Sequence, residues 1–537
     1  MHRDHLAEEG KAHALRPLAL ILAMFVVAVL PLFATPVLPF IDYYNHLARY
    51  HVLANIADNA TLAGNYAAQW AILPNIGLDV VMTAAMGFIP KWTAAHALAM
   101  GLLAVQFGGV VAFNRALTGR LSVLVALLTV PLLYSFILTW GFANFLLGLG
   151  LVFWAAAWWL SMRHRLTLAL PAACVFATII FLVHGLAFAL YGVLLGLLEI
   201  GLWLRKKERR LTGLLLAMLP LLVQAVAPVM LFLGSQTSKV EDGLTNADES
   251  VQRLLQTGGL AARLWELAQY RLVTILRVSE GPSLAFDVLM GLAVLAVLAV
   301  LVARRRLILS GVAWPAIAGL TVLVLVMPPA MFGVGYAADR LPLMLALVVV
   351  GSVSVLPATD LRARKLDNRL FGALGLLVAL RLGAVGLDWH GYADDHRDFT
   401  AVAATLPPGA LVETINVEAA RLQDRRRCEM YGPLLIAEHN AIGRLFANES
   451  QQPLRITGSL KAAIASSPRP DKQALHQPGY FDDMLQRAAE SDFGWVFLCD
   501  SERLTRPLPA NLRVAAAQGR FTLLSIGAGS ARTSLGG

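Results

Sequence analysis

The sequence predicts an all-α polytopic membrane protein with about eleven spans and a small C-terminal extracytoplasmic domain of α/β or α+β type. Three observations lead to this fold class. Of the 537 residues, 57% are hydrophobic and only 15% are charged, whereas a soluble protein of this length needs more polar surface. The apolar residues form long uncharged runs, and the composition becomes polar after Leu387.

The apolar runs match the length of membrane-spanning helices, because a helix needs about 20 apolar residues to cross roughly 30 Å of hydrocarbon. The first run, at 18–38, is too long for the core of a signal peptide and is followed by many others, so we interpret it as a retained anchor. The runs that meet or approach the required length are 18–38, 121–138, 143–161, 166–183, 185–204, 211–234, 283–303, 307–328, 341–357 and 369–387.

Short clusters of Lys and Arg between the runs indicate the orientation. The net charge of +9 is concentrated in these clusters, which favours a membrane protein over nucleic-acid binding, since short basic loops stay in the cytoplasm. Counting crossings from the clusters places the N-terminus inside, and the loops 39–75 and 235–282 and the C-terminal domain outside. The clusters are 163–165, 205–210, 304–306 and 362–369.

The same count requires an odd number of crossings between residues 76 and 114. The apolar piece at 76–90 would be only about 22 Å long as a helix. We therefore expect one span at 93–113 and, at 76–90, a short helix that lies in or dips into the outer leaflet.

We expect a transmembrane domain at 1–388 and an extracytoplasmic domain at 389–537. The second is long enough for a core of its own. A helix is expected at 394–405, because the breaker cluster at 406–409 ends it. Short apolar runs alternate with helical stretches in the rest of the domain, which indicates a mixed fold. The runs are 410–416, 432–437, 494–499 and 520–526, and the helical stretches are 418–424 and 481–490.

The three cysteines leave two possibilities open. Cys174 lies inside a predicted span, whereas Cys428 and Cys499 lie in the C-terminal domain. These two can form a disulfide if the domain is extracytoplasmic, or they can be unpaired small core residues.

The segment after the first span carries the main candidate site. If a helix begins near Asp42, polar residues recur at i, i+3, i+4 and i+7 and share one face. These residues are Asp42, Asn45, His46 and Arg49. A carboxylate at the outer membrane surface can act as a general base, and an arginine suits a phosphate oxygen. The same pattern fits an interfacial amphipathic helix with a hydrated polar face and Asp42 as its N-cap.

This segment resembles the GT-C membrane glycosyltransferases. They carry an acidic residue near the outer end of the first span, in a long first outer loop, and the resemblance extends to the expected span number and outer C-terminal domain. It implies that Asp42 is the catalytic base and that the donor is a sugar on a polyprenyl phosphate in the outer leaflet. The local form, from Asp42 through Tyr43 to Arg49, is most similar to uncharacterised bacterial membrane proteins of this type, which implies the bacterial inner membrane. The usual Asp-Glu pair is absent, because Tyr43 follows Asp42.

We expect no metal and no cofactor. The sequence has no P-loop, no Gly-rich dinucleotide fingerprint and no cysteine cluster for zinc. Asp42 and His46 offer two metal ligands at i and i+4, but a third is not evident.

Other residues near the outer ends of spans are candidates for substrate contacts. The resemblance implies that Arg340, which begins a span from the outside, holds the donor phosphate; contact with lipid headgroups or with Asp339 is the alternative. Arg381 lies deep in the last run and must face protein or water, with a structural partner as its alternative. The further candidates are Tyr43, Asp79, Trp140, Asn144 and His184. The alternative for Trp140 is a place in the interfacial aromatic belt, and the alternative for His184 is a role in helix packing.

The expected activity is inverting transfer of a sugar from a polyprenyl-phosphate donor to a glycan, lipid or protein acceptor on the extracytoplasmic face. Asp42 would deprotonate the acceptor, and Arg340 with Arg49 would stabilise the leaving phosphate. One alternative is a lipid-linked glycan polymerase or ligase with a diphosphate donor, which two or more arginines in one outer pocket would favour. Another is a non-catalytic transporter or assembly subunit for surface polysaccharide. The sequence shows neither a repeat nor mid-span carboxylates, which counts against a transporter.

Overall fold

The computed structural model describes residues 2–239, 259–328, 335–356, 360–417, 428–445, 452–470, 477 and 479–527. The chain forms two compact units. The first, here called the helical unit, contains 1–34, 72–77 and 96–388, and the second, the α/β unit, contains 35–71, 78–95 and 389–537. The α/β unit therefore combines the segment after the first helix with the C-terminal residues, which the expected division at 388 did not include.

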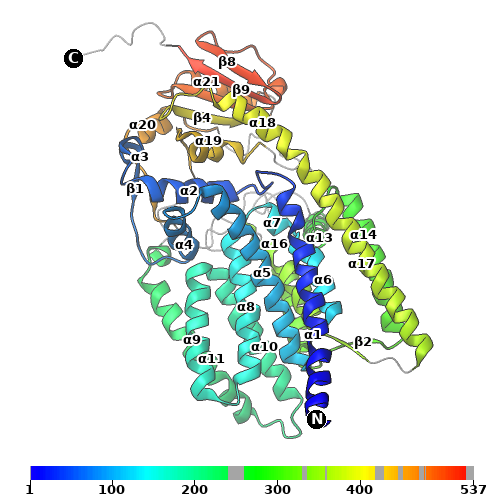
Figure 1. The fold of residues 1–537 in the computed structure, drawn as a ribbon. Helices are drawn as coiled ribbons and strands as arrows, with labels where there is room; N and C mark the ends of the chain where they lie inside the picture. Colours follow the sequence, from blue (N-terminus) through cyan, green and yellow to red (C-terminus); the bar gives the residue numbers. More distant parts are fainter. Residues whose placement is uncertain are drawn as a thin grey trace. The chain divides into compact units, whose positions relative to one another are not determined.

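The helical unit confirms the predicted fold class of a multi-pass membrane protein. In the described part of the chain, eight helices are long and apolar enough to cross a membrane, and most run side by side (Figure 1). They are carried by α1 (His2–Val29), α5 (Lys91–Thr118), α8 (Ala143–Met162), α9 (Leu166–Val183), α10 (Gly185–Leu204), α11 (Leu211–Gly234), α14 (Leu284–Ala303) and α17 (Leu361–His390).

The other three predicted spans coincide with shorter helices, α6 (Val123–Leu133), α15 (Trp314–Val326) and α16 (Ala337–Gly351). The expected span 121–138 is interrupted after Leu133, where the Tyr134 hydroxyl donates to the Ala28 carbonyl and a separate short helix, α7 (Phe136–Thr139), begins. The expected spans 307–328 and 341–357 are wrong at one end each. Residues there form two antiparallel strands, β2 (Leu307–Leu309) and β3 (Val353–Val355), since β-branched residues suit a strand.

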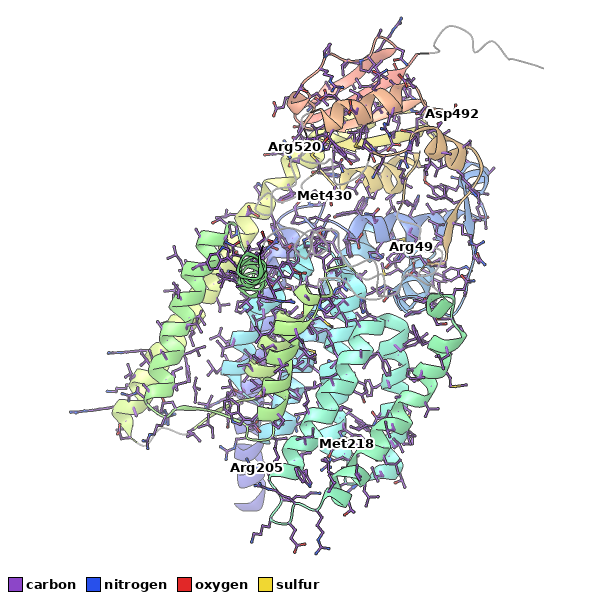
Figure 2. All side chains as sticks on the ribbon, turned by 180° about the vertical axis from the view of Figure 1, so that it is seen from behind. Arg49, Arg205, Met218, Met430, Asp492 and Arg520 are labelled. Atoms are coloured by element: carbon purple, nitrogen blue, oxygen red, sulfur yellow. A yellow bond between two sulfur atoms is a disulfide. The ribbon has the colours of Figure 1, made fainter. Side chains whose placement is uncertain are left out.

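The basic clusters gather at one end of the helices. Arg306 pairs with Asp367 at 2.6 Å and Arg163 pairs with Glu199 at 2.5 Å, so the ends of α14 and α17 meet, as do the ends of α8 and α10. Arg205 also lies against Gly311, just before α15, and Figure 2 shows it where α10 stops. These contacts agree with the counting of crossings, which places the clusters on one side.

Glycines allow close packing of α5 on α8. A Cβ atom on Gly150 would lie 2.8 Å from the backbone nitrogen of Gln106, and one on Gly109 would lie 2.6 Å from the Gly150 carbonyl oxygen. Because backbone atoms cannot move aside cheaply, only glycine fits at this crossing.

The α/β unit is built on a mixed five-stranded sheet of order β5-β4-β7-β9-β8. Its central strand pairs in parallel with one neighbour and antiparallel with the other. The strands are β4 (Leu411–Asn416), β5 (Ile442–Gly443), β7 (Trp495–Cys499), β8 (Leu512–Gln518) and β9 (Phe521–Ile526), and the helices of its C-terminal part are α18 (Tyr392–Ala403), α19 (Tyr431–His439), α20 (Gly458–Ser466) and α21 (Tyr480–Ala489).

The segment after the first helix is part of this unit by pairing and by packing. It forms α2 (Tyr43–Asn55), α3 (Ala60–Asn65), β1 (Tyr66–Ala68) and α4 (Gly77–Met86). Strand β1 pairs antiparallel with β6 (Leu454–Ile456). Val52 of α2 shares one buried cluster with Ile436 of α19, so burial of apolar surface holds α2 against the C-terminal residues.

The apolar run 432–437 lies in helix α19, whereas the other three apolar runs coincide with the strands β4, β7 and β9. A short apolar run does not distinguish a buried strand from a helix, and Pro433 is tolerated in the first turn. The expected helices at 394–405 and 481–490 are α18 and α21. The stretch 418–424 lies outside the described residues.

Cys428 and Cys499 form a disulfide within the α/β unit, and both are fully buried. This resolves the two possibilities left open by the sequence. Cys174 is a free cysteine of the helical unit.

Candidate functional site

Helix α2 presents the predicted polar face. Asp42 precedes its first residue, and the side chain of Asp42 makes no capping hydrogen bond to the backbone. The Asp42 carboxylate instead lies 3.2 Å from Nε2 of His46, and Asn45 donates to its other oxygen at 3.5 Å. The spacing of i, i+3 and i+4 therefore brings these side chains together as expected.

The contacts continue inward as a chain of four residues, here called the Asp42 chain: Asp42, His46, Arg49 and Asp79. Arg49 lies 2.7 Å from Nδ1 of His46 through Nη2. On its other side it donates to Asp79 of α4 in a two-pronged contact, at 2.5 Å from Nε and 3.3 Å from Nη2. A bidentate arginine–carboxylate contact fixes orientation as well as charge.

Burial increases steadily along the Asp42 chain. The Asp42 side chain is 31% exposed and that of His46 is 14% exposed, whereas Arg49 and Asp79 are each 1% exposed. Figure 2 shows Arg49 among the side chains around α2. One carboxylate is thus accessible to a substrate, and the ion pair behind it is not.

Burial and the neighbouring carboxylate have opposite effects on the pKa of Arg49. Burial by itself lowers the pKa of Arg49, but the adjacent Asp79 carboxylate outweighs this and the pKa of Arg49 lies above its ordinary value. Burial also raises the pKa of the Tyr50 hydroxyl. Arg49 therefore stays charged and Tyr50 stays neutral, and Asp79 compensates the arginine.

Further contacts fix α2 in place. The Tyr43 hydroxyl donates to the Ala95 carbonyl at 2.5 Å, and both Tyr43 and Tyr44 are fully buried. His51 contacts Asn440 at 2.9 Å. Tyr43 is thus placed as a support of the helix, not at its accessible face.

In the helical unit, Arg340 lies against aromatic rings. Its guanidinium is 4.4 Å from the centre of the Phe142 ring and 5.4 Å from that of Phe145, and the residue is 4% exposed. Phe142 belongs to an aromatic cluster that we define as Phe136, Trp140, Phe142 and Tyr336, in which the Trp140 and Tyr336 rings lie 4.5 Å apart. Stacking on aromatic faces suits an arginine.

A second arginine lies on the same aromatic cluster. Arg277 is 3.9 Å from the centre of the Phe136 ring, and it pairs with Glu280 at 2.7 Å. Glu280 is tied to the helical unit, because its backbone N–H donates to the Tyr134 carbonyl at 2.7 Å.

Three other predicted residues of the helical unit have structural partners. Arg381 donates to Asp287 at 2.7 Å in a buried pair. His184 precedes α10, and its Nδ1 accepts from the backbone N–H of Ala187 at 3.4 Å. Asn144 donates to the Asn75 carbonyl at 2.8 Å. A structural partner was the alternative stated for Arg381, and helix packing was the alternative stated for His184.

Sequence reasoning missed two groups. Pairing of Asp79 with Arg49 spans 30 residues and depends on packing of α4 on α2, which no local period reveals. A second cluster, Glu438 with His396 and His439, brings Glu438 within 3.6 Å and 3.8 Å of the two imidazoles. The adjacent pair Glu438-His439 was its one sequence signal.

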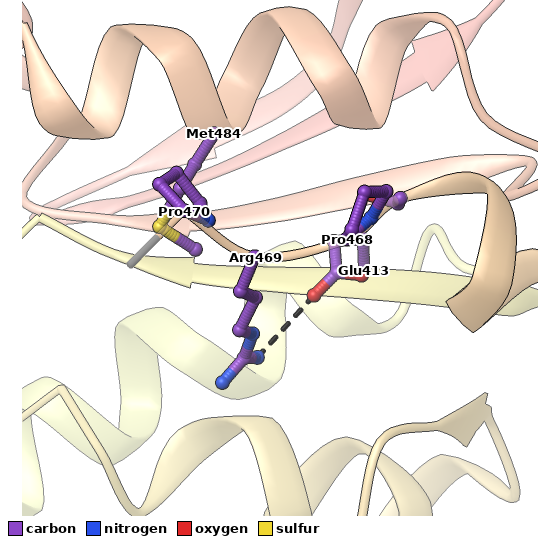
Figure 3. A pocket seen from close by; sticks show the side chains of 6 residues that line it. Glu413, Pro468, Arg469, Pro470 and Met484 are labelled. Carbon is purple, nitrogen blue, oxygen red and sulfur yellow. Dashed lines mark hydrogen bonds and ion pairs between the residues drawn. The ribbon is translucent and has the colours of Figure 1, made fainter. Parts of the chain in front are cut away.

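A surface pocket of the α/β unit is lined by Glu413, Ser467, Pro468, Arg469, Pro470 and Met484. Figure 3 shows Arg469 turned toward Glu413, at 3.3 Å, and Arg444 contacts the same carboxylate at 2.7 Å. Because two arginines already pair with the Glu413 carboxylate, we interpret this pocket as a structural ion-pair site.

In the part of the chain that the structure describes, no group of three potential metal ligands lies at the Asp42 chain. Among the described residues, one group of three potential ligands lies close together: Cys428, Cys499 and Asp500. Its two cysteines are joined as a disulfide, so they offer no thiolate to a metal.

No protein-family model matches the chain, and no curated protein matches it. Several solved structures are similar, among them those of ArnT and AftD. The crystal structure of ArnT from Cupriavidus metallidurans bound to undecaprenyl phosphate matches with a TM-score of 0.48 and 13% identity, over 95% of this chain and 98% of that chain. The arabinofuranosyltransferase AftD from Mycobacteria matches with a TM-score of 0.40 and 15% identity, over 95% of this chain but 41% of that chain. Scores below 0.5 at such identity assign no function by themselves.

Proposed function

We propose that the chain is a membrane glycosyltransferase that transfers a sugar from a polyprenyl-phosphate donor to an acceptor hydroxyl on the outer face of the bacterial inner membrane. The observation that carries the proposal is the Asp42 chain. A single accessible carboxylate is held by an imidazole, and a buried ion pair supports that imidazole. Such a preorganised carboxylate is what a general base requires.

The reaction needs one base and no protein nucleophile. Asp42 takes the proton of the acceptor hydroxyl while the acceptor oxygen forms a bond to the anomeric carbon. The bond between that carbon and the phosphate oxygen breaks, and polyprenyl phosphate leaves with the electron pair. A direct displacement inverts the anomeric configuration.

The leaving phosphate is assigned to Arg340 of the helical unit. Its guanidinium is almost fully buried against Phe142 and Phe145, and a cation in a low-dielectric setting stabilises developing charge strongly. Arg49 is not assigned this role, because its guanidinium already contacts Asp79 on one side and His46 on the other.

The placement of Trp140 supports a role at the sugar. It is half-buried in the aromatic cluster, with its ring nearly parallel to that of Phe142 at 5.8 Å. An indole face is suited to the apolar side of a sugar ring.

A lipid-linked polymerase or ligase with a diphosphate donor is a second candidate. The observation that favours it is the placement of both Arg277 and Arg340 on the rings of one aromatic cluster. Glu280 compensates Arg277, so the monophosphate donor stays the first choice.

The extracytoplasmic location is supported by the disulfide between Cys428 and Cys499, because disulfides persist in oxidising compartments. The proposed location of the α/β unit, and of Asp42 with it, is therefore the periplasmic side. The acceptor is then a glycan, lipid or protein of the cell envelope.

The test is a transfer assay with purified protein in proteoliposomes. A panel of polyprenyl-monophosphate and polyprenyl-diphosphate sugars is supplied with envelope acceptors, and release of the lipid carrier is measured by chromatography. Release of polyprenyl phosphate together with a glycosylated product is expected. Release of the diphosphate carrier would establish the second candidate. No release from the whole panel by folded protein would reject both enzymes and favour a transport or assembly role.

A further inference from the structure

His46 lies between two groups whose chemistry determines where its proton is. Nη2 of Arg49 is 2.7 Å from Nδ1 of His46, and Oδ2 of Asp42 is 3.2 Å from Nε2. A guanidinium has donors only and does not lose a proton in proteins. Nδ1 of His46 must therefore act as the acceptor, and a neutral imidazole with an accepting Nδ1 carries its proton on Nε2.

The charged imidazolium does not fit this position. It would set an N–H of His46 against an N–H of Arg49 at 2.7 Å and add a positive charge beside a guanidinium that is 1% exposed. Two donors facing each other with like charge at this depth repel strongly.

Asp79 determines the direction in which Arg49 points. Its two oxygens accept from Nε and Nη2 of Arg49, so the plane of the guanidinium is fixed and Nη2 is shared with His46. The other groups around His46 are Asp42, Asn45 and the ring of Tyr50, whose centre lies 6.2 Å away. None of these three supplies a second donor to Nδ1 in the described contacts.

We propose that Asp79 and Arg49 are positioning residues that hold His46 as the neutral tautomer with its proton on Nε2. His46 then directs a donor at Asp42 and does not accept a proton from it. The catalytic meaning of this inference rests on the proposed function, but the tautomer of His46 does not.

The consequence is that the proton taken from the acceptor ends on Asp42. In a serine–histidine–aspartate arrangement the histidine is the base and the carboxylate orients it; here the order of roles is reversed. The proton leaves Asp42 for water, since this side chain is 31% exposed.

The direct test is nitrogen NMR of the full chain, labelled with ¹⁵N-histidine, in lipid nanodiscs. The chain has 12 histidines, so the His46 signals are assigned as those missing from His46→Gln. The expected spectrum near neutral pH has a protonated Nε2 and an unprotonated Nδ1. An imidazolium, or a proton on Nδ1, would overturn the inference.

A double variant tests the cause. Arg49→Met with Asp79→Asn removes both buried charges together, which avoids leaving one uncompensated. The proton of His46 should then no longer be confined to Nε2, because Arg49 no longer donates to Nδ1. The matched control, Arg306→Met with Asp367→Asn, removes another buried ion pair and should leave the His46 spectrum unchanged. A folded double variant with the wild-type His46 spectrum would overturn the role of Arg49. If the double variant does not fold, the wild-type spectrum still decides the tautomer.

The activity readout separates this inference from the proposed function. In the transfer assay the folded double variant should lose on the order of tenfold to a hundredfold in kcat, with KM little changed. A merely structural role would lower the yield of folded protein and leave the kcat of the folded fraction unchanged, which contradicts the inference. The expected spectrum in a wild-type protein without transfer activity would reject the function and retain the tautomer. Transfer activity with an imidazolium at His46 would reject the inference and retain the function.

Discussion

At the scale of single residues, helical periodicity predicted the accessible part of the candidate site. Asp42, Asn45 and His46 meet because residues three and four apart share a face. The same periodicity assigned Arg49 to a phosphate, whereas Arg49 is buried against Asp79. Which side of a helix is buried depends on elements distant in sequence. Helical periodicity therefore could not predict that Arg49 and Asp79 form the buried half of the Asp42 chain.

A titratable cluster of the α/β unit predicts a pH dependence of stability. Burial raises the pKa of Glu438 to about 7, and the nearby Lys91 opposes this shift. The imidazoles of His396 and His439 lie close to the same carboxylate, and burial lowers the pKa of both. Each of these groups is held preferentially in its neutral form.

The sign for Glu438 follows from proton binding. Between the ordinary glutamate pKa near 4.3 and the folded value of about 7, the folded protein binds more protons at this residue than the unfolded chain does. Its contribution to stability is therefore full below that window and is lost as the pH rises through it. The two histidines act in the opposite direction, because their contribution is lost as the pH falls below their ordinary pKa.

We expect Glu438→Gln to be more stable than wild type at pH 8, by on the order of 2 kcal/mol, and to lose this advantage near pH 5. Thermal unfolding in detergent at a series of pH values measures the difference. A gap between the two proteins that is the same at pH 5 and pH 8 would contradict the assignment of the raised pKa to Glu438.

At the scale of elements, composition and run length predicted most helices but not their interruptions. The run 121–138 is uniformly apolar, yet its helix ends at Leu133, because Tyr134 bonds to the backbone of α1. The short strands β2 and β3 replace the ends of two expected spans. These interruptions depend on partners far along the chain, so an apolar run does not reveal them.

The crossing of α5 and α8 predicts opposite effects for two glycine substitutions. Gly150→Ala adds a Cβ that meets backbone atoms of α5 at 2.8 Å, so it should destabilise the protein by about 1–3 kcal/mol. Gly196→Ala in α10 has nothing within 4 Å, and should stabilise it by up to about 1 kcal/mol, because alanine favours the helix. Melting temperatures in one detergent compare the two. Equal shifts of the same sign would refute the close packing of α5 and α8.

At the scale of the whole molecule, the sequence predicted the fold class and the sharp change near residue 388. It did not predict that residues 35–71 and 78–95 belong to the same compact unit as the C-terminal residues. The pairing of β1 with β6 joins residues almost 400 positions apart. A strand of three residues is also too short to give a recognisable alternation of apolar and polar residues in the sequence. The residue taken as the base is therefore built into the C-terminal unit.

The disulfide predicts both stability and location. Cys428 and Cys499 are 71 residues apart, and closing a loop of this length stabilises a domain by about 4 kcal/mol. Cys428→Ser with Cys499→Ser should therefore make the α/β unit sensitive to protease at temperatures that wild type withstands.

The location of the α/β unit is tested in a Cys174→Ser variant, which lacks the free thiol of the helical unit. Cells are quenched with acid and denatured so that the buried cysteines are accessible, and the remaining two cysteines should react with a maleimide–polyethylene glycol only after reduction. Reaction without a reductant would indicate a reducing compartment and contradict the extracytoplasmic assignment.

The central claim is that the Asp42 carboxylate activates the acceptor in glycosyl transfer, and the most direct measurement compares Asp42→Asn with wild type. Both proteins are assayed in proteoliposomes with the donor that wild type uses, alongside Asp58→Asn, which removes an exposed carboxylate just after α2. We expect kcat to fall on the order of 10²–10⁴-fold in Asp42→Asn, with KM little changed and Asp58→Asn at the wild-type rate. Equal rates for Asp42→Asn and wild type would contradict the claim.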